Sequence, residues 1–183
     1  KTTNTGNPKS QESRQYTVLQ HGSKGVIVVL ANDVATVQQE PYYQNIGPYL
    51  PDYTVVTFTL PDHTPGYTVR PLTTWARHGS MVEVVEATNA ILTTIQNDFP
   101  HQPFIVSGIS RGGYLAAMYP DADYYFLFAP VLDWLQLREW KDIPNHPPEA
   151  LWEFQKDAKY YVYSSTNDER VNGTVVIEYV EEN

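Results

Sequence analysis

The stretch Phe104–Tyr114, which reads F-I-V-S-G-I-S-R-G-G-Y, decides the fold of this chain. Its first four residues favour a strand, and helix-forming residues follow its last glycine. Between them, Gly108 to Gly112 have the pattern Gly-x-Ser-x-Gly, whose glycines let a strand reverse sharply into a helix. The pattern therefore predicts a strand, a tight turn and a helix, with Ser110 at the apex of the turn.

This position suits Ser110 to act as a nucleophile. At a helix N-terminus, unused backbone N–H groups and the positive end of the helix dipole stabilise negative charge on a substrate oxygen. The pattern fixes only three residues, so it also fits a turn without a chemical role. The apolar strand before Ser110 and the helix after it favour the catalytic interpretation.

Composition excludes several classes of function. The chain has 183 residues, enough for one domain, and a formal charge of −9, which repels nucleic-acid backbones. It has no cysteine, so disulfides and cysteine-based zinc sites are excluded, and no histidine pair has zinc-site spacing. We therefore expect neither metal nor cofactor, no nucleic acid and, without an apolar run of about 20 residues, no membrane span. The compartment stays open between cytoplasm and secretion after processing.

Strand and helix patterns alternate along the chain. Residues 1–14 have almost nothing to bury and predict a flexible lead-in, so that 15–183 form a single domain. The alternation predicts an α/β fold with a mostly parallel, doubly wound sheet flanked by helices. In such sheets ligands bind beyond the carboxyl ends of the strands. The expected strands are Gln15–Gln20, Gly25–Leu30, Tyr53–Thr59, Phe104–Ser107, Tyr124–Phe128 and Tyr160–Ser164, and the expected helices are Gln39–Leu50, Trp75–Phe99, the helix after the turn, Asp133–Trp140 and Glu149–Lys156.

Four segments make the chain similar to the α/β-hydrolase family, and more closely to its compact bacterial-type esterases and peptidase-like members. The resemblance covers most of Gly25 to Tyr179 and implies a serine hydrolase that acts on a carboxylic ester or related acyl bond of a small molecule. The segments are Leu-Pro-x-His at Leu60–His63, G-I-S-R-G-G-Y at Gly108–Tyr114, F-A-P-V-L-D at Phe128–Asp133 and N-D-E-R-V at Asn167–Val171.

The resemblance assigns roles residue by residue. Ser110 matches the nucleophile, and the backbone N–H of Arg111 matches one donor of the oxyanion hole. Asp168 matches the acid of the catalytic triad, although Asn-Asp-Glu also suits an ordinary turn. The second oxyanion donor of the family follows the first buried strand, commonly as His-Gly. This chain has Ala31-Asn32 there, then Asp33, whose negative charge would oppose an oxyanion.

The triad histidine has no match in this chain. The family order is Ser, Asp, His, and no histidine follows Asp168. The chain therefore resembles either a C-terminally shortened hydrolase, whose base lies in further sequence, or a catalytically inactive module that binds a ligand or partner. His63 follows a strand and is a weaker candidate for the base, because the family has a histidine in that loop without a triad role. Packing or surface roles are favoured for His21, His78, His101 and His146.

Two further expectations concern surfaces. Trp134 is a candidate for lining an acyl pocket, with ordinary core packing as the alternative. The strand at Tyr160–Ser164 is the last clear one, so a shortened sheet would end there with unpaired backbone groups. Such an edge would favour a homo-oligomer. The segment Gly173–Glu182 fits a helix and a strand equally well.

Overall fold

Six strands form one sheet in the computed structural model, which describes residues 16–30, 47–61, 81–130 and 157–165. The strand order is β1-β3-β2-β4-β5-β6. β1 pairs antiparallel with β3, and the other four pairings are parallel, which confirms the mostly parallel α/β sheet. The strands are β1 (Thr17–Gln20), β2 (Val26–Leu30), β3 (Thr54–Thr57), β4 (Phe104–Ile109), β5 (Tyr124–Phe128) and β6 (Lys159–Tyr163).

Burial along each strand follows its place in the sheet. Every residue of β2 and β3 is buried, as expected for interior strands with both faces covered. β1 at one end of the sheet alternates between exposed and half-buried residues, and so does β6 at the other end. The apolar run Val26–Leu30 therefore marks the centre of the sheet, as its sequence predicts.

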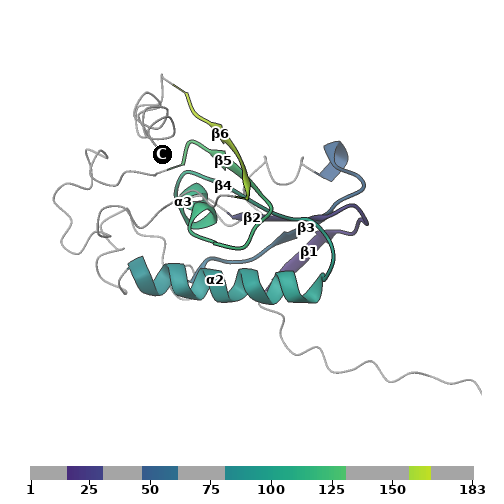
Figure 1. Ribbon diagram of the computed structural model, residues 1–183, viewed down its shortest axis with the longest axis horizontal. Coiled ribbons are helices and arrows are strands. Elements are labelled where there is room, and N and C mark those ends of the chain that lie inside the picture. The colour runs from purple at the N-terminus through teal and green to yellow at the C-terminus, as the bar shows by residue number, and fades with distance from the viewer. Residues whose placement is uncertain (1–15, 31–46, 62–80, 131–156, 166–183) are drawn as a thin grey trace, which may run out of the picture.

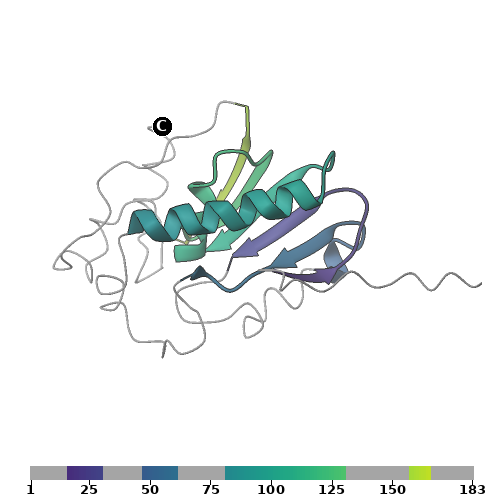
Figure 2. The ribbon, with the colours of Figure 1, turned by 90° about the horizontal axis from the view of Figure 1, so that it is seen from below.

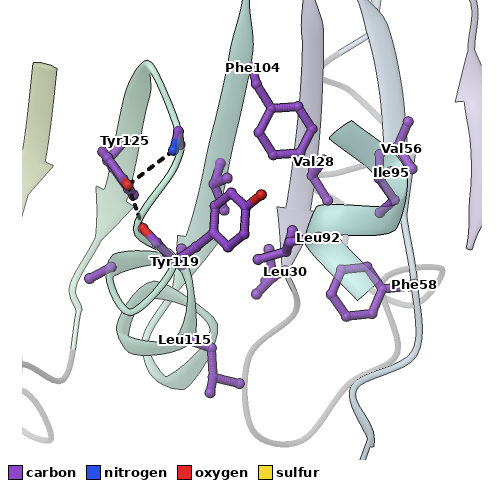
Figure 3. Packing of buried hydrophobic residues seen from close by; sticks show 14 of the residues in the cluster. Val28, Leu30, Val56, Phe58, Leu92, Ile95, Phe104, Leu115, Tyr119 and Tyr125 are labelled. Atoms are coloured by element: carbon purple, nitrogen blue, oxygen red, sulfur yellow. Dashed lines mark hydrogen bonds between the residues drawn. The ribbon is translucent and has the colours of Figure 1, made fainter. Parts of the chain in front are cut away.

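Two helices cover one face of the sheet. α2 (Met81–Asp98) lies along the sheet in Figure 1 and crosses in front of the strands in Figure 2. It buries Val85, Leu92 and Ile95, which recur at helical spacing. α3 (Arg111–Ala117) is buried along its whole length and packs on the same face. Figure 3 shows part of the resulting core, in which Leu92 of α2 lies beside Leu30 of β2; Leu115 of α3 belongs to the same cluster.

A second, smaller cluster lies on the opposite face. It consists of Ile27, Val29, Val55 and Ile105, all buried, with Leu50 packed against them. Residues 47–49 just before Leu50 are helical, at the end of the helix expected from Gln39. The helices expected between β5 and β6, at Asp133–Trp140 and Glu149–Lys156, lie outside the described residues, as do the flexible lead-in and the segment Gly173–Glu182.

Several element boundaries differ by a few residues from those expected. β3 is shorter than the expected Tyr53–Thr59, and β6 begins at Lys159 and ends at Tyr163 rather than running from Tyr160 to Ser164. The long helix is described from Met81, and residues 75–80 of the expected span lie outside the described part. Pairing with the neighbouring strand, which the local sequence does not show, sets where a strand ends.

Hydrogen bonds link the amino ends of three parallel strands. The carboxylate Oδ2 of Asp123 accepts from the N–H of Phe104 at 2.7 Å, and the N–H of Asp123 donates to the Phe104 carbonyl at 2.9 Å. The Asp123 carbonyl also accepts from the N–H of Lys159 at 3.1 Å. One aspartate thus ties together the starts of β4, β5 and β6.

A buried tyrosine completes this end. The Tyr125 hydroxyl donates to the Tyr119 carbonyl and accepts from the N–H of Ala122 at 3.3 Å (Figure 3). Its ring stacks on Tyr160, with centroids 4.4 Å apart. Burial raises the pKa of Tyr125 above the ordinary tyrosine value, because an ionised phenol would lose its hydration.

Candidate active site

Ser110 lies between β4 and α3, at the turn predicted from Gly-x-Ser-x-Gly. β4 ends at Ile109 and α3 begins at Arg111, so a single residue reverses the chain from strand to helix. Ser110 takes φ 55° and ψ −117° to do so. The predicted strand, turn and helix are therefore confirmed.

The glycine before the turn is required by close backbone packing. A Cβ atom at Gly108 would lie 2.1 Å from the carbonyl oxygen of Gly112 and 2.7 Å from the backbone nitrogen of Gly113. Real Cβ atoms do not approach backbone atoms so closely. The first glycine of the pattern thus lets the strand and the helix start pass each other, which is the physical role expected from the sequence.

The Ser110 hydroxyl does not cap helix α3. A serine at the N-cap usually accepts a hydrogen bond from a backbone N–H in the first helical turn. Ser110 occupies the N-cap of α3, yet its side chain makes no capping hydrogen bond. A non-glycine residue in this part of φ/ψ space costs on the order of 1–3 kcal/mol. The fold therefore holds Ser110 in a strained backbone conformation while its hydroxyl is not used for capping.

A second strained residue lies beside Ser110 at the carboxyl end of β5. Ala129 has φ 42° and is one of three non-glycine residues with positive φ in the described part of the chain. The N–H of Ser110 donates to the Phe128 carbonyl at 2.8 Å, and that of Ala129 donates to the Tyr163 carbonyl at 2.6 Å. The carboxyl ends of β4, β5 and β6 are thus tied in one row, where such sheets bind ligands.

Local sequence does not predict the positive φ of Ala129. Pro130 follows it, and a residue before proline is ordinarily held in the extended region with negative φ. A structural signal is the hydrogen bond from Ser110 to Phe128, which fixes the end of β5 against the turn. In the sequence, the F-A-P segment at Phe128–Pro130 carries only the family resemblance.

Arg111 is buried, and it opens α3 next to Ser110. Its side chain is 2% exposed. The first backbone hydrogen bond of the helix runs from the N–H of Tyr114 to the Ser110 carbonyl at 3.1 Å. The N–H of Arg111 precedes this bond, so the helical ladder does not use it. This is the group that the family resemblance assigns to the oxyanion hole.

The end of β2 lies beside the turn. Leu30, the last residue of β2, pairs with Gly108 of β4. The chain therefore leaves β2 next to the strand that carries Ser110. Asn32 and Asp33, the positions expected to supply the second oxyanion donor, follow β2 but lie outside the described residues.

Comparisons with known proteins find similarity to solved structures only. No protein-family model matches the sequence, and no curated protein matches it. Many solved structures do match the fold. An alpha-beta serine hydrolase homologue from Coxiella burnetii superposes with a TM-score of 0.62 at 13% identity, over 91% of this chain and 75% of that one.

Two other solved structures have hydrolase names. A sugar hydrolase from Lactococcus lactis has a TM-score of 0.60 at 15% identity, over 91% of this chain and 71% of that chain. The carboxylesterase Cest-2923 from Lactobacillus plantarum has a TM-score of 0.57 at 14% identity, over 91% and 71% of the two chains. The chain also spans 42% of the length of a protein of unknown function from Staphylococcus aureus, with a TM-score of 0.48.

The chain has the α/β-hydrolase fold. In this fold Ser110 occupies the turn between a central strand and the helix after it, in agreement with the sequence resemblance. Identities this low show the fold alone and assign no role to a side chain.

The histidines of this α/β-hydrolase fold divide into two groups. His21 and His101 precede β2 and β4, so they lie at the amino ends of parallel strands. A strand of six residues such as β4 spans about 20 Å, which separates this end from Ser110. Neither histidine can therefore serve as its base. His63, His78 and His146 lie outside the described residues, as do Asp168 and Trp134.

The described residues were also compared with the requirements of a metal site and of a membrane-spanning helix. No three His, Asp or Glu side chains gather there in a way that could hold a metal ion. None of the helices found there is long and apolar enough to cross a membrane.

Proposed function

We propose that this chain is a serine hydrolase that acts on a carboxylic ester or related acyl bond of a small molecule, with Ser110 as nucleophile. The observation that carries the proposal is the conformation of Ser110. It is strained at positive φ, it lies between β4 and α3, and its hydroxyl does not cap the helix. Strain of this kind persists where the surrounding structure enforces it, and it clusters at active sites.

The chemistry follows from the position of Ser110. Its Oγ attacks the acyl carbon, a base takes the hydroxyl proton, and the carbonyl oxygen becomes an oxyanion. The backbone N–H of Arg111 stabilises that charge, with a second donor from the segment of Asn32 and Asp33. The leaving alcohol departs with a proton from the base, and water then hydrolyses the acyl-enzyme. Asp168 would orient and stabilise the protonated base.

Two candidates exist for the base that takes the proton from Ser110. His63 is one candidate, and a histidine supplied by sequence beyond Asn183 is the other. Loss of the triad histidine costs about 10⁶-fold in kcat in subtilisin, so the identity of the base decides whether this chain turns over substrate alone.

A second candidate function is a catalytically inactive α/β-hydrolase-like module that binds a ligand or partner. It is favoured by one feature of the sequence: Asp33 stands in the segment to which the family resemblance assigns the second oxyanion donor, and its negative charge would oppose an oxyanion. The name of one solved structure, a carboxylesterase, supports a small-molecule ester substrate for the first candidate.

The two candidates differ in the reactivity of Ser110. A fluorophosphonate probe should label Ser110 in the first case, and mass spectrometry of the digested protein identifies the labelled peptide. Ser110→Ala should abolish labelling. Ser107→Ala is the matched control. Ser107 lies on β4, the strand that leads into Ser110, and its hydroxyl is buried and makes no hydrogen bond in the described structure. It should leave labelling unchanged.

Turnover completes the test. Hydrolysis of p-nitrophenyl acetate by the 183-residue chain, lost in Ser110→Ala and kept in Ser107→Ala, would exclude the inactive module. If Ser110 remains unlabelled even in a longer chain that contains a downstream histidine, the serine hydrolase proposal is wrong.

A further inference from the structure

Hydrogen bonds hold the backbone of Ser110 on both sides of its Cα atom. Its N–H donates to the Phe128 carbonyl at 2.8 Å, and its carbonyl accepts from the N–H of Tyr114 at 3.1 Å. Peptide units are planar, so these two bonds fix the two planes that meet at Ser110 and restrict its φ and ψ. The strained conformation of Ser110 therefore depends on where the end of β5 lies relative to α3.

The end of β5 also contacts α3 directly, through Pro130. Pro130 is buried, and a Cβ atom at Gly113 in the first turn of α3 would lie 3.0 Å from the Pro130 Cβ and 3.1 Å from its Cα. Carbon atoms in ordinary contact are about 3.5–4.0 Å apart, so the glycine lets Pro130 approach the helix this closely. The proline ring also fixes its own φ. Pro130 thus sets the distance between the end of β5 and the helix.

Ala129 is the one residue between these two contacts. Its φ is 42°, although a residue before proline ordinarily has a negative φ. Its N–H donates to the Tyr163 carbonyl at 2.6 Å, which ties it to β6. Strain of this kind persists only where the surrounding structure enforces it. The contacts of the residues on either side of Ala129, together with its own bond to β6, supply that enforcement.

We propose that Phe128, Ala129 and Pro130 form a brace that positions Ser110 for attack on its substrate, an inference that rests on the proposed role of Ser110 as nucleophile. The brace holds Ser110 through the Phe128 carbonyl, meets α3 at Gly113 and is closed by the positive φ of Ala129. Its three residues act through the backbone of Ser110, so they are positioning residues.

A brace and ordinary packing at the end of β5 predict different results. Ordinary packing contributes to stability alone, so any loss of reactivity at Ser110 would follow a loss of folded protein. With a brace, a variant that moves the end of β5 away from α3 changes the conformation of Ser110 while the chain stays folded. The reactivity and the backbone conformation of Ser110 should then change together.

Two substitutions of Ala129 separate these cases. Positive φ is far less favourable for a β-branched residue than for alanine, so Ala129→Val should take negative φ and open the brace. Glycine adopts positive φ freely, so Ala129→Gly should leave the brace closed. We expect a fluorophosphonate probe to label Ser110 about 10-fold to 100-fold more slowly in Ala129→Val, because a small misplacement of a reacting group has an effect of this size. The rate in Ala129→Gly should match that of the unmodified chain, and circular dichroism checks that both variants are folded.

Gly113→Ala tests the other side of the contact. Its Cβ would push Pro130 away from α3, and we expect labelling of Ser110 to slow by about tenfold. Gly25→Ala is the matched control, because its Cβ would also lie 3.0 Å from its nearest neighbour but at the amino ends of the strands. It should leave the labelling rate unchanged.

NMR reports the backbone of Ser110 without requiring reactivity. The Cα and Cβ chemical shifts of Ser110 follow its φ and ψ, and exchange of its amide hydrogen reports the bond to Phe128. Ala129→Val and Gly113→Ala should move these shifts and speed this exchange, whereas Ala129→Gly should preserve the slow exchange.

The two readouts distinguish failure of the brace from failure of the hydrolase proposal. If Ser110 of the unmodified chain is not labelled, the hydrolase proposal fails, and the NMR shifts alone decide whether the brace holds Ser110. Unchanged shifts in Ala129→Val and Gly113→Ala would overturn the brace. So would undiminished labelling of these variants in a chain that does react, or equal slowing in Gly25→Ala.

Discussion

The two ends of the parallel strands are held by different means. At the amino ends, the carboxylate and backbone of Asp123 bind the starts of β4 and β6, and the Tyr125 hydroxyl bonds to the chain that leads into β5. At the carboxyl ends, backbone hydrogen bonds join the same strands, and two residues in the row, Ser110 and Ala129, are strained. Side-chain hydrogen bonds thus tie the amino ends, whereas two of the three described non-glycine residues with positive φ, Ser110 and Ala129, lie at the carboxyl ends; the third, His101, precedes β4.

The amino ends of the strands therefore contribute mainly to stability, and the carboxyl ends hold the candidate active site. Hydrogen bonds at the amino ends stabilise the strands without forming a surface for ligands. The carboxyl ends hold a serine in a conformation that an isolated peptide would avoid, at a cost that the rest of the sheet offsets. Substitutions at the two ends should therefore differ in sign as well as in size.

The largest effect is expected at the turn itself. Gly108→Ala places a Cβ atom 2.1 Å from the Gly112 carbonyl oxygen, so strand or helix must move. We expect the free energy of unfolding to fall by about 3 kcal/mol, with loss of any reactivity at Ser110. Urea denaturation measures the first effect. Gly25→Ala at the amino end is the control and should cost less, because its Cβ would lie 3.0 Å from the Tyr53 ring and 3.1 Å from the Pro103 carbonyl oxygen, compared with 2.1 Å at Gly108. An equal loss in both variants would contradict a tightly packed turn.

An intermediate effect is expected at the amino end. Tyr125→Phe removes a buried hydroxyl that makes two hydrogen bonds, and should lower the free energy of unfolding by about 2 kcal/mol at neutral pH. Tyr124→Phe on the same strand should have little effect. Neither variant should alter probe labelling of Ser110, and a loss of labelling in Tyr125→Phe would show that the two ends are coupled.

The same tyrosine gives stability a dependence on pH. Burial raises the pKa of Tyr125 above the ordinary value of 10.0 in the folded state. Both states are neutral below that value, so the shift has no effect there. As pH rises above it, the unfolded chain ionises first and stability falls. The decline between neutral pH and strongly alkaline pH should be shallower in Tyr125→Phe than in the unmodified chain, as urea denaturation at both pH values will measure.

The smallest effect should have the opposite sign. Glycine adopts positive φ without penalty, so Ala129→Gly should raise the free energy of unfolding by about 0.5 kcal/mol, after allowance for the freedom that glycine adds to the unfolded chain. Ala122→Gly at the amino end should lower it by about 1 kcal/mol, since Ala122 is buried and has no strain to relieve. Thermal unfolding compares the two. Destabilisation of equal size would show that Ala129 stores no strain.

Local patterns in the sequence predict the elements of this fold better than their arrangement. The apolar run Val26–Leu30 and the turn around Ser110 are read correctly, because hydrophobic periodicity and glycine placement act within a few residues. The order of the strands and the shift in register of β1 between Val18 and Gln20 depend on contacts between distant segments. The strain at Ala129 contradicts the local preference of a residue before proline. The roles of Asp168 and of the oxyanion positions stay predictions.

The pairing of β2 with β4 also constrains how the molecule assembles. Val26 lies against Phe104, so this junction closes a loop of about 80 residues, whereas β4, β5 and β6 follow one another more closely in sequence. Long-range parallel pairing of this kind slows folding, because chain entropy is lost before the contact forms. The strand that carries Ser110 is the one that joins the two halves. The turn at Ser110 depends on contacts that are nearer in sequence, such as the bond from its N–H to the Phe128 carbonyl, so we expect it to form independently of this slow junction.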